Sequence, residues 1–252
     1  MLQAEVCLEG LRVRVWQHRG SEHADQDRWV TALLGDRLRV AAIDGVTPWQ
    51  SPAGPGGDAA QMAAAAVAGA LLLPVPARDA LTLANRMLHR PEVTPSRRQP
   101  MAAVAVADCL RDVAGVDAHV VVAADCEVWA ADHRGALTLA AGGDFLRPHA
   151  RAAWCEIRDR LPPGADLLSA EAETLDDPST QVRHAVGRYR DPVWSEGAIT
   201  APALVVASDG CRLLQWAEAQ EPVLAALPAW LEAVASRTRR DDLTCLLVEP
   251  VG

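Results

Sequence analysis

Lysine is absent from this 252-residue sequence, so all 24 of its Lys or Arg residues are arginines. A P-loop of the GxxxxGK(S/T) type needs its lysine to reach the phosphates, so this absence excludes a P-loop NTPase. The seven histidines show neither HxH nor HExxH spacing, which argues against a zinc hydrolase. No GxSxG motif occurs, so Ser208 is not expected to act as a nucleophile.

Paired cysteines and targeting segments are also missing. The six cysteines lie far apart and form no CxxC pair, which supports neither a zinc site nor a disulfide framework. Residues 1–10 lack a basic region followed by a long apolar stretch, so we expect no secretory signal. The longest apolar segment, residues 59–77, is Ala-rich and broken by prolines, which favours a buried helix over a membrane span. We therefore expect a soluble, cytoplasmic protein.

Charge and composition narrow the class further. The net charge of −9 argues against nucleic acid or an anionic membrane as the main partner. Half of the residues are hydrophobic, so the chain should fold around a core. We expect a single domain over residues 1–252, and the Ala, Val, Gly, Pro and Arg usage is typical of a GC-rich bacterial genome.

Four acidic clusters lie at the edges of apolar runs. They are Gln26-Asp27, Asp44-Gly45, Asp209-Gly210 and Asp241-Asp242. Each cluster alone is compatible with a turn, because Asp-Gly is a common turn dipeptide. A strand that ends in Asp, however, holds a carboxylate rigidly at the rim of a sheet, and several such rims together form an oxygen-rich pocket. The set therefore predicts a site for hard divalent cations.

The order of strand-like and helical segments predicts the fold class. Hairpin-linked apolar runs occur early, in the middle and at the end of the chain, with helical segments between them. Expected helices cover residues 59–73, 78–89, 148–161 and 179–187, a start near 211, and 222–236. Hairpins imply antiparallel sheets. We expect an α+β fold, an αββα sandwich of two antiparallel sheets flanked by helix pairs.

The ordered motifs resemble the metal-dependent serine/threonine protein phosphatases of type 2C, the PPM family. The similar segments are ADQDRW at 24–29, AAIDGV at 41–46, AADCEV at 123–128, ASDG at 207–210 and RRDDLTCLLV at 239–248. The resemblance extends over about residues 4–249. It implies the αββα fold and two Mn²⁺ or Mg²⁺ ions at one end, with a possible third, weaker ion.

The resemblance also implies roles for particular residues. The implied metal ligands are Asp27, Asp44, Gly45, Asp125, Asp209 and Asp241. Asp44 would bridge two ions, and the Gly45 carbonyl would bind the second. Asp125 would belong to the third position together with Asp209. The implied catalytic residues are Asp27, Asp44, Asp209 and Asp241.

Some positions depart from the family pattern. Glu22 replaces an arginine that frequently contacts the substrate phosphate, and Leu213 replaces an acidic residue that can support the third ion. Cys126 and Glu127 replace Ser and Arg in the central motif. Trp49 lies in the Pro/Gly-rich loop that follows Asp44-Gly45, where we expect it either at the entrance of the site or as a core anchor.

The leading hypothesis is a phosphatase that acts on phosphoserine or phosphothreonine in a protein partner, by attack of metal-activated water. Its substrate would be phosphorylated by a cognate Ser/Thr kinase, and the enzyme would act as a monomer. Two alternatives stay open. One is a degenerate type 2C-like domain that binds a partner with little turnover. The other is a phosphatase of a small phosphorylated metabolite.

Overall fold

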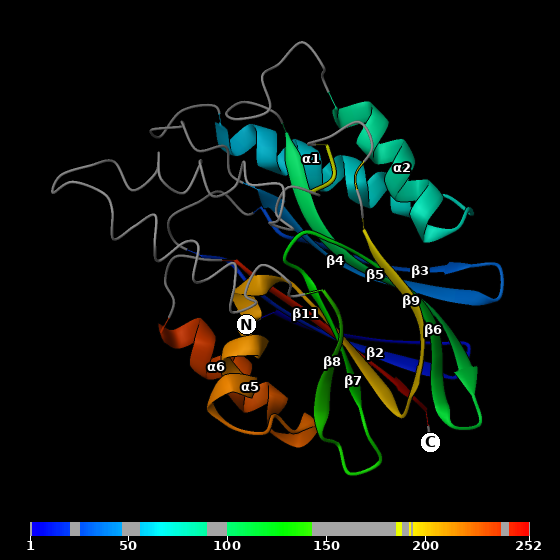
Figure 1. Cartoon of the computed structure of the whole chain (residues 1–252), viewed down its shortest axis with the longest axis vertical. Coiled ribbons are helices and arrows are strands. Elements are labelled where there is room, and N and C mark those ends of the chain that lie inside the picture. Colours follow the sequence, from blue (N-terminus) through cyan, green and yellow to red (C-terminus); the bar gives the residue numbers. More distant parts are fainter. Residues whose placement is uncertain are drawn as a thin grey trace, which may run out of the picture.

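The computed structural model describes residues 2–20, 26–46, 56–89, 100–142, 185–187, 192, 194–237 and 242–251. In this part of the chain the strands form two antiparallel sheets, one of six strands and one of five. The sheets pack face to face, and helices cover both outer faces (Figure 1). The expected αββα sandwich is confirmed. None of the helices in these ranges is long and apolar enough to cross a membrane.

The six-stranded sheet contains both ends of the chain. Its order is β1 (Leu2–Leu8), β2 (Leu11–His18), β11 (Leu243–Pro250), β10 (Ala203–Ala207), β7 (Glu127–Ala131) and β8 (Leu137–Gly142). In β2 the residues Leu11, Val13 and Val15 are buried while Arg12 and Arg14 are half-exposed. This period-2 alternation turns one face of the strand toward the core between the sheets.

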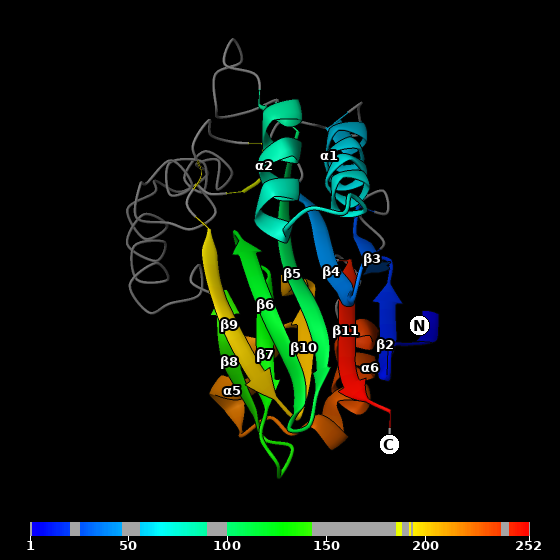
Figure 2. The ribbon, with the colours of Figure 1, turned by 90° about the vertical axis from the view of Figure 1, so that its right-hand side faces the viewer.

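The five-stranded sheet is buried more deeply. Its order is β3 (Arg28–Leu34), β4 (Arg37–Val46), β5 (Met101–Asp112), β6 (Gly115–Ala123) and β9 (Ser195–Ala201), seen face on in Figure 2. Strand β5 is buried continuously over its first nine residues. Both faces are covered, one by the other sheet and one by helices, so an unbroken apolar run is the expected pattern.

The helices divide between the two outer faces. Helices α1 (Gly56–Leu71) and α2 (Ala77–Leu88) pack on the five-stranded sheet. Helices α5 (Leu213–Ala219) and α6 (Leu227–Arg237) pack on the six-stranded sheet (Figure 1). The 3₁₀ turns η3 (Asp209–Cys211) and η4 (Leu224–Ala226) precede them.

Some expected helix boundaries are wrong. The helix expected near residue 211 starts at Leu213, because Arg212 has a left-handed φ of 53° that separates it from the preceding 3₁₀ turn. The expected helix at 179–187 does not include its last residues, since Val186 forms an antiparallel bridge with Ala102. Residues 148–161 and 179–184 lie outside the described residues.

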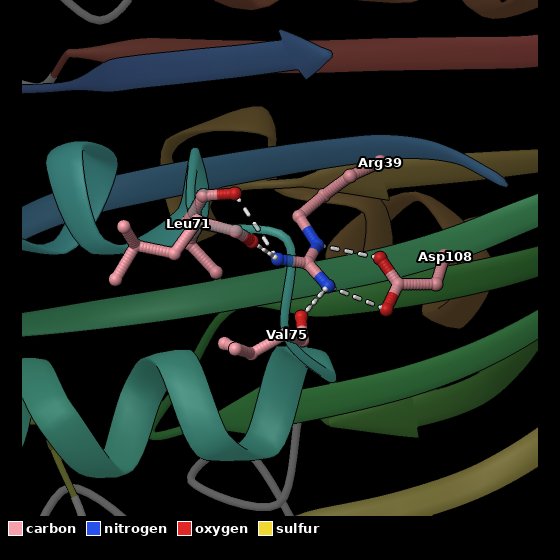
Figure 3. A network of polar contacts seen from close by, with 5 residues as sticks. Arg39, Leu71, Val75 and Asp108 are labelled. Carbon is pink, nitrogen blue, oxygen red and sulfur yellow. Dashed lines mark hydrogen bonds and ion pairs between the residues drawn. The ribbon is translucent and has the colours of Figure 1, made fainter. Parts of the chain in front are cut away.

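A buried ion pair fixes the connection between α1 and α2. Arg39 of β4 is 2% exposed, and its guanidinium donates to both carboxylate oxygens of Asp108 on β5, at 2.6 and 2.8 Å. The same guanidinium donates to the carbonyls of Leu71, Leu73 and Val75 (Figure 3). The charge is thereby paired and hydrogen-bonded, as a buried arginine requires. Neither Arg39 nor Asp108 belongs to the motifs described above, so the pair was not predicted from the sequence.

Candidate metal centre

Strand register places three of the acidic motifs at one end of the six-stranded sheet. Ala207, the last residue of β10, pairs with Glu127 on β7 and with Cys245 on β11. Asp209 follows β10 by two residues, Asp125 precedes β7, and Asp242 immediately precedes β11. These three carboxylates therefore lie at the same end of the sheet, where β7, β10 and β11 begin or finish side by side.

The five-stranded sheet contributes two more carboxylates. Arg28 at the start of β3 pairs with Ile43 near the end of β4, so Asp27 and Asp44 lie at the same edge of this sheet. Asp44 pairs with Ala103, and Gly45 pairs with Ala102 on β5. Ala102 also pairs with Val186, and the Gly187 amide donates to the buried side chain of Asn85 at 2.7 Å. The segment around Val186 is thus anchored to β5 on the side opposite β4 and Gly45.

A hydrogen bond joins the two edges. The Ser208 hydroxyl donates to Asp27 Oδ2 at 3.0 Å and accepts from the Thr244 backbone N–H at 3.0 Å. Ser208 lies just after β10 and Asp27 just before β3, so this contact connects the two sheets.

Two glycines bring the motifs into close contact. A Cβ on Gly45 would lie 2.5 Å from the Ala60 carbonyl oxygen of α1 and 3.1 Å from the Gln26 carbonyl oxygen. A Cβ on Gly210 would overlap the backbone carbonyl of Asp242. Both positions therefore need glycine, because no side chain would fit there. Close packing, and not only a turn, accounts for the glycine in these two Asp-Gly pairs.

Asp27 is the most deeply buried of these carboxylates, at 1% exposure. Its pKa is raised to about 7, chiefly by burial and also by the nearby Asp242 charge, while the side chains of Thr244, Ser208 and Asp44 oppose the shift. Asp27 Oδ1 has no hydrogen-bond partner among the described residues. A buried carboxylate oxygen without a partner is costly unless a proton or a cation neutralises it.

The buried thiol of Cys126 is influenced by four of these carboxylates. Burial raises its pKa well above the usual value, and the charges of Asp125, Asp44, Asp209 and Asp27 raise it further. These four carboxylates come from motifs that are far apart in the sequence. Their convergence on one metal site stays a prediction.

Glu127 is a second buried acid at this edge. It is 1% exposed, and its Oε2 accepts a hydrogen bond from Trp129 Nε1 at 2.8 Å, while Oε1 has no partner within the described ranges. Its pKa is raised to about 8, chiefly by burial and also by the Asp125 charge, against the effect of that hydrogen bond. It stands where the family pattern has a basic residue.

The candidate ligands suit a hard cation chemically. They are carboxylates and the backbone carbonyl of Gly45, and they include no thiolate or imidazole. The orphaned Oδ1 of Asp27 is consistent with that fit. Across the described ranges, no three His, Cys, Asp or Glu side chains are gathered closely enough to hold an ion as they stand. Asp241, Trp49 and Glu22 lie outside the described residues. Leu213 is fully buried.

No protein-family model and no curated protein matches the chain. Solved structures match it over nearly its whole length. RsbX in complex with magnesium is 12% identical, with 99% of this chain and 100% of that chain covered and a TM-score of 0.58. A serine/threonine phosphatase of S. agalactiae is 15% identical, with 94% and 98% covered and a TM-score of 0.61.

A third similar structure is the PPM Ser-Thr phosphatase MsPP from Mycobacterium smegmatis in complex with cacodylate. It is 16% identical, with 95% of this chain and 98% of that chain covered and a TM-score of 0.56. The chain therefore has the fold of the PPM-type phosphatases, and the fold that the type 2C resemblance implied is confirmed.

Proposed function

We propose that this protein is a metal-dependent phosphatase that hydrolyses phosphoserine or phosphothreonine in a protein partner. The observation that carries the proposal is the link between Ser208 and Asp27, which joins the acidic edges of the two sheets. The fold shared with PPM-type phosphatases supports the same function. The magnesium in RsbX supports a divalent cation as the cofactor.

Asp44, the Gly45 carbonyl and Asp209 would hold Mn²⁺ or Mg²⁺ together with Asp241, with Asp27 acting through bound water and Asp125 at a third position. When bound, the ions supply positive charge that acidifies water and offsets the charge of the phosphoryl group. The chain itself excludes bulk water from Asp27 and fixes its carboxylate through Ser208. Because Gly45 has no side chain, α1 can also pack closely against the end of β4.

The proposal is tested by release of phosphate from p-nitrophenyl phosphate and from phosphoserine and phosphothreonine peptides, with Mn²⁺, Mg²⁺ or EDTA. Asp44→Asn and Asp209→Asn should each lower turnover at least about a hundredfold, because each removes charge that the site uses in the transition state. Asp36→Asn, in the exposed β3–β4 turn, is the matched control and should retain wild-type turnover.

The outcomes separate the candidate functions. Near-normal turnover in Asp44→Asn would contradict the assignment. Metal binding without turnover on any substrate would favour the degenerate binding domain, which is consistent with the ungathered ligand side chains in the described residues. Turnover of small phosphorylated metabolites but not of phosphopeptides would favour the metabolite phosphatase.

A further inference from the structure

The carboxylate of Asp242 accepts hydrogen bonds from the backbone of Gly20 and of Gln26. Its Oδ1 accepts from the Gly20 backbone N–H at 2.7 Å. Its Oδ2 accepts from the Gln26 N–H at 2.6 Å and lies 3.3 Å from the Asp27 nitrogen. One side chain therefore bonds to Gly20 and Gln26 and at the same time contacts the backbone of Asp27.

Asp242 is itself held firmly. It directly precedes β11, whose first residue Leu243 pairs with His18 at the end of β2. Its backbone carbonyl packs against Gly210, which leaves no room for a Cβ at that position. The Asp242 carboxylate therefore projects from a fixed point between the Asp209 motif and the Asp27 motif.

We propose that Asp242 is a positioning residue of the metal centre: it sets the backbone of Asp27 relative to the Asp209 edge. This inference rests on the proposed function. A carboxylate with two accepting oxygens suits the task, because its bonds to backbone N–H groups are short and strong. Asp242 thus differs in role from its neighbour Asp241, for which a ligand role is proposed.

A carboxylate that acts through its bonds to other groups should affect metal binding without touching the ion. Outer groups that orient metal ligands typically change metal affinity by about 10- to 100-fold when they are removed. We expect Asp242→Ala to weaken binding of Mn²⁺ to the full chain by this factor in a calorimetric titration. We expect Asp242→Asn to lie between Ala and wild type, because its amide keeps one accepting oxygen.

Glu249 provides a matched control on the same strand. Its Oε1 accepts from Arg12 Nε and Arg14 Nη2, both at 2.7 Å, near the opposite end of β11. Glu249→Ala also removes a carboxylate with two donors but should leave the Mn²⁺ affinity unchanged. A similar fall in melting temperature in both variants, with wild-type Mn²⁺ affinity in Asp242→Ala, would reduce Asp242 to a structural role and overturn the proposal.

Amide hydrogen exchange tests the geometry separately from the metal. In metal-free Asp242→Ala the amides of Gly20 and Gln26 should exchange faster than in wild type, while those near Glu249 keep their rates. Unchanged exchange at Gly20 and Gln26 would overturn the proposal even if activity fell. A wild-type chain that binds no Mn²⁺ would instead overturn the proposed function, and the exchange result would then report only on the bonds of Asp242 to Gly20 and Gln26.

Discussion

The hydroxyl of Ser208 donates to Asp27 across the interface between the two sheets, at 3.0 Å. Because the same oxygen accepts the Thr244 backbone N–H at 3.0 Å, its single proton is directed to the carboxylate. Ser208 is 1% exposed, so water has little access to this pair. The contact fixes one oxygen of Asp27 and leaves the other, Oδ1, without a partner among the described residues.

Ser208→Ala should weaken Mn²⁺ binding by about 10- to 100-fold, because the orienting bond to Asp27 is lost. The free energy of unfolding should fall by about 1–3 kcal/mol, since the Asp27 oxygen and the Thr244 N–H lose a buried partner. Calorimetric titration and urea unfolding measure the two effects. Ser236→Ala is the control, because its hydroxyl bonds only to Ala233 on the exposed face of α6. Unchanged Mn²⁺ affinity in Ser208→Ala would show that the bond does not orient Asp27.

Gly45→Ala and Gly69→Ala should have opposite effects. The new Cβ at Gly45 would lie 2.5 Å from the Ala60 carbonyl oxygen, so α1 or β4 must shift at the proposed metal edge. We expect lower stability and weaker Mn²⁺ binding. At Gly69, in α1, no atom lies within 4 Å of the new Cβ, and alanine should add about 0.5–1 kcal/mol of stability. Thermal melts with and without Mn²⁺ distinguish them. A Gly45→Ala protein as stable as wild type would refute the packing argument.

The fold class could be predicted because it depends on local patterns. The alternation in residues 11–16 and the apolar run at 38–45 identify strands directly. The convergence of Asp27 and Asp44 at one edge also follows, since both flank paired strands. What the sequence predicted less well is the partner of each polar side chain, which depends on the register of strands far apart in the chain.

Arg39 illustrates this limit. A single arginine in an apolar strand is expected to point to solvent. Arg39 is instead buried and pairs with Asp108, 69 residues away. The same holds for Asp242, which the sequence could not distinguish from Asp241. Its role follows from contacts 215 to 222 residues away in the chain. Such contacts leave no periodic signal in the sequence.

Asp108→Ala should lower the free energy of unfolding by about 3–5 kcal/mol, because it leaves the Arg39 charge buried without its partner. The double variant Arg39→Met/Asp108→Leu should recover much of this loss, since no buried charge remains. Urea unfolding measures both. Asp112→Ala, at the exposed end of β5, is the control and should stay near wild type. A loss below about 1 kcal/mol in Asp108→Ala, the range of exposed pairs, would contradict the buried-pair argument.

Glu127 should make stability depend on pH. Its pKa is raised to about 8 in the folded protein, chiefly by burial, from a usual 4.5. Between these values the native carboxyl keeps a proton that the unfolded chain has lost, so stability is full below about pH 4.5 and falls as the pH rises toward 8. One such group contributes a slope of up to about 1.4 kcal/mol per pH unit.

The Gln side chain in Glu127→Gln cannot ionise. The free energy of unfolding should therefore fall less steeply with pH, by the contribution of about one proton. Urea unfolding in EDTA at several pH values between 5 and 8 measures the slope. Some slope should remain below pH 7, because the pKa of Asp27 is also raised, to about 7. Glu232→Gln, at an exposed position on α6, is the control and should show the same pH dependence of the free energy of unfolding as wild type. An unchanged slope in Glu127→Gln would show that Glu127 is ionised in the folded protein at these pH values, and it would refute the raised pKa.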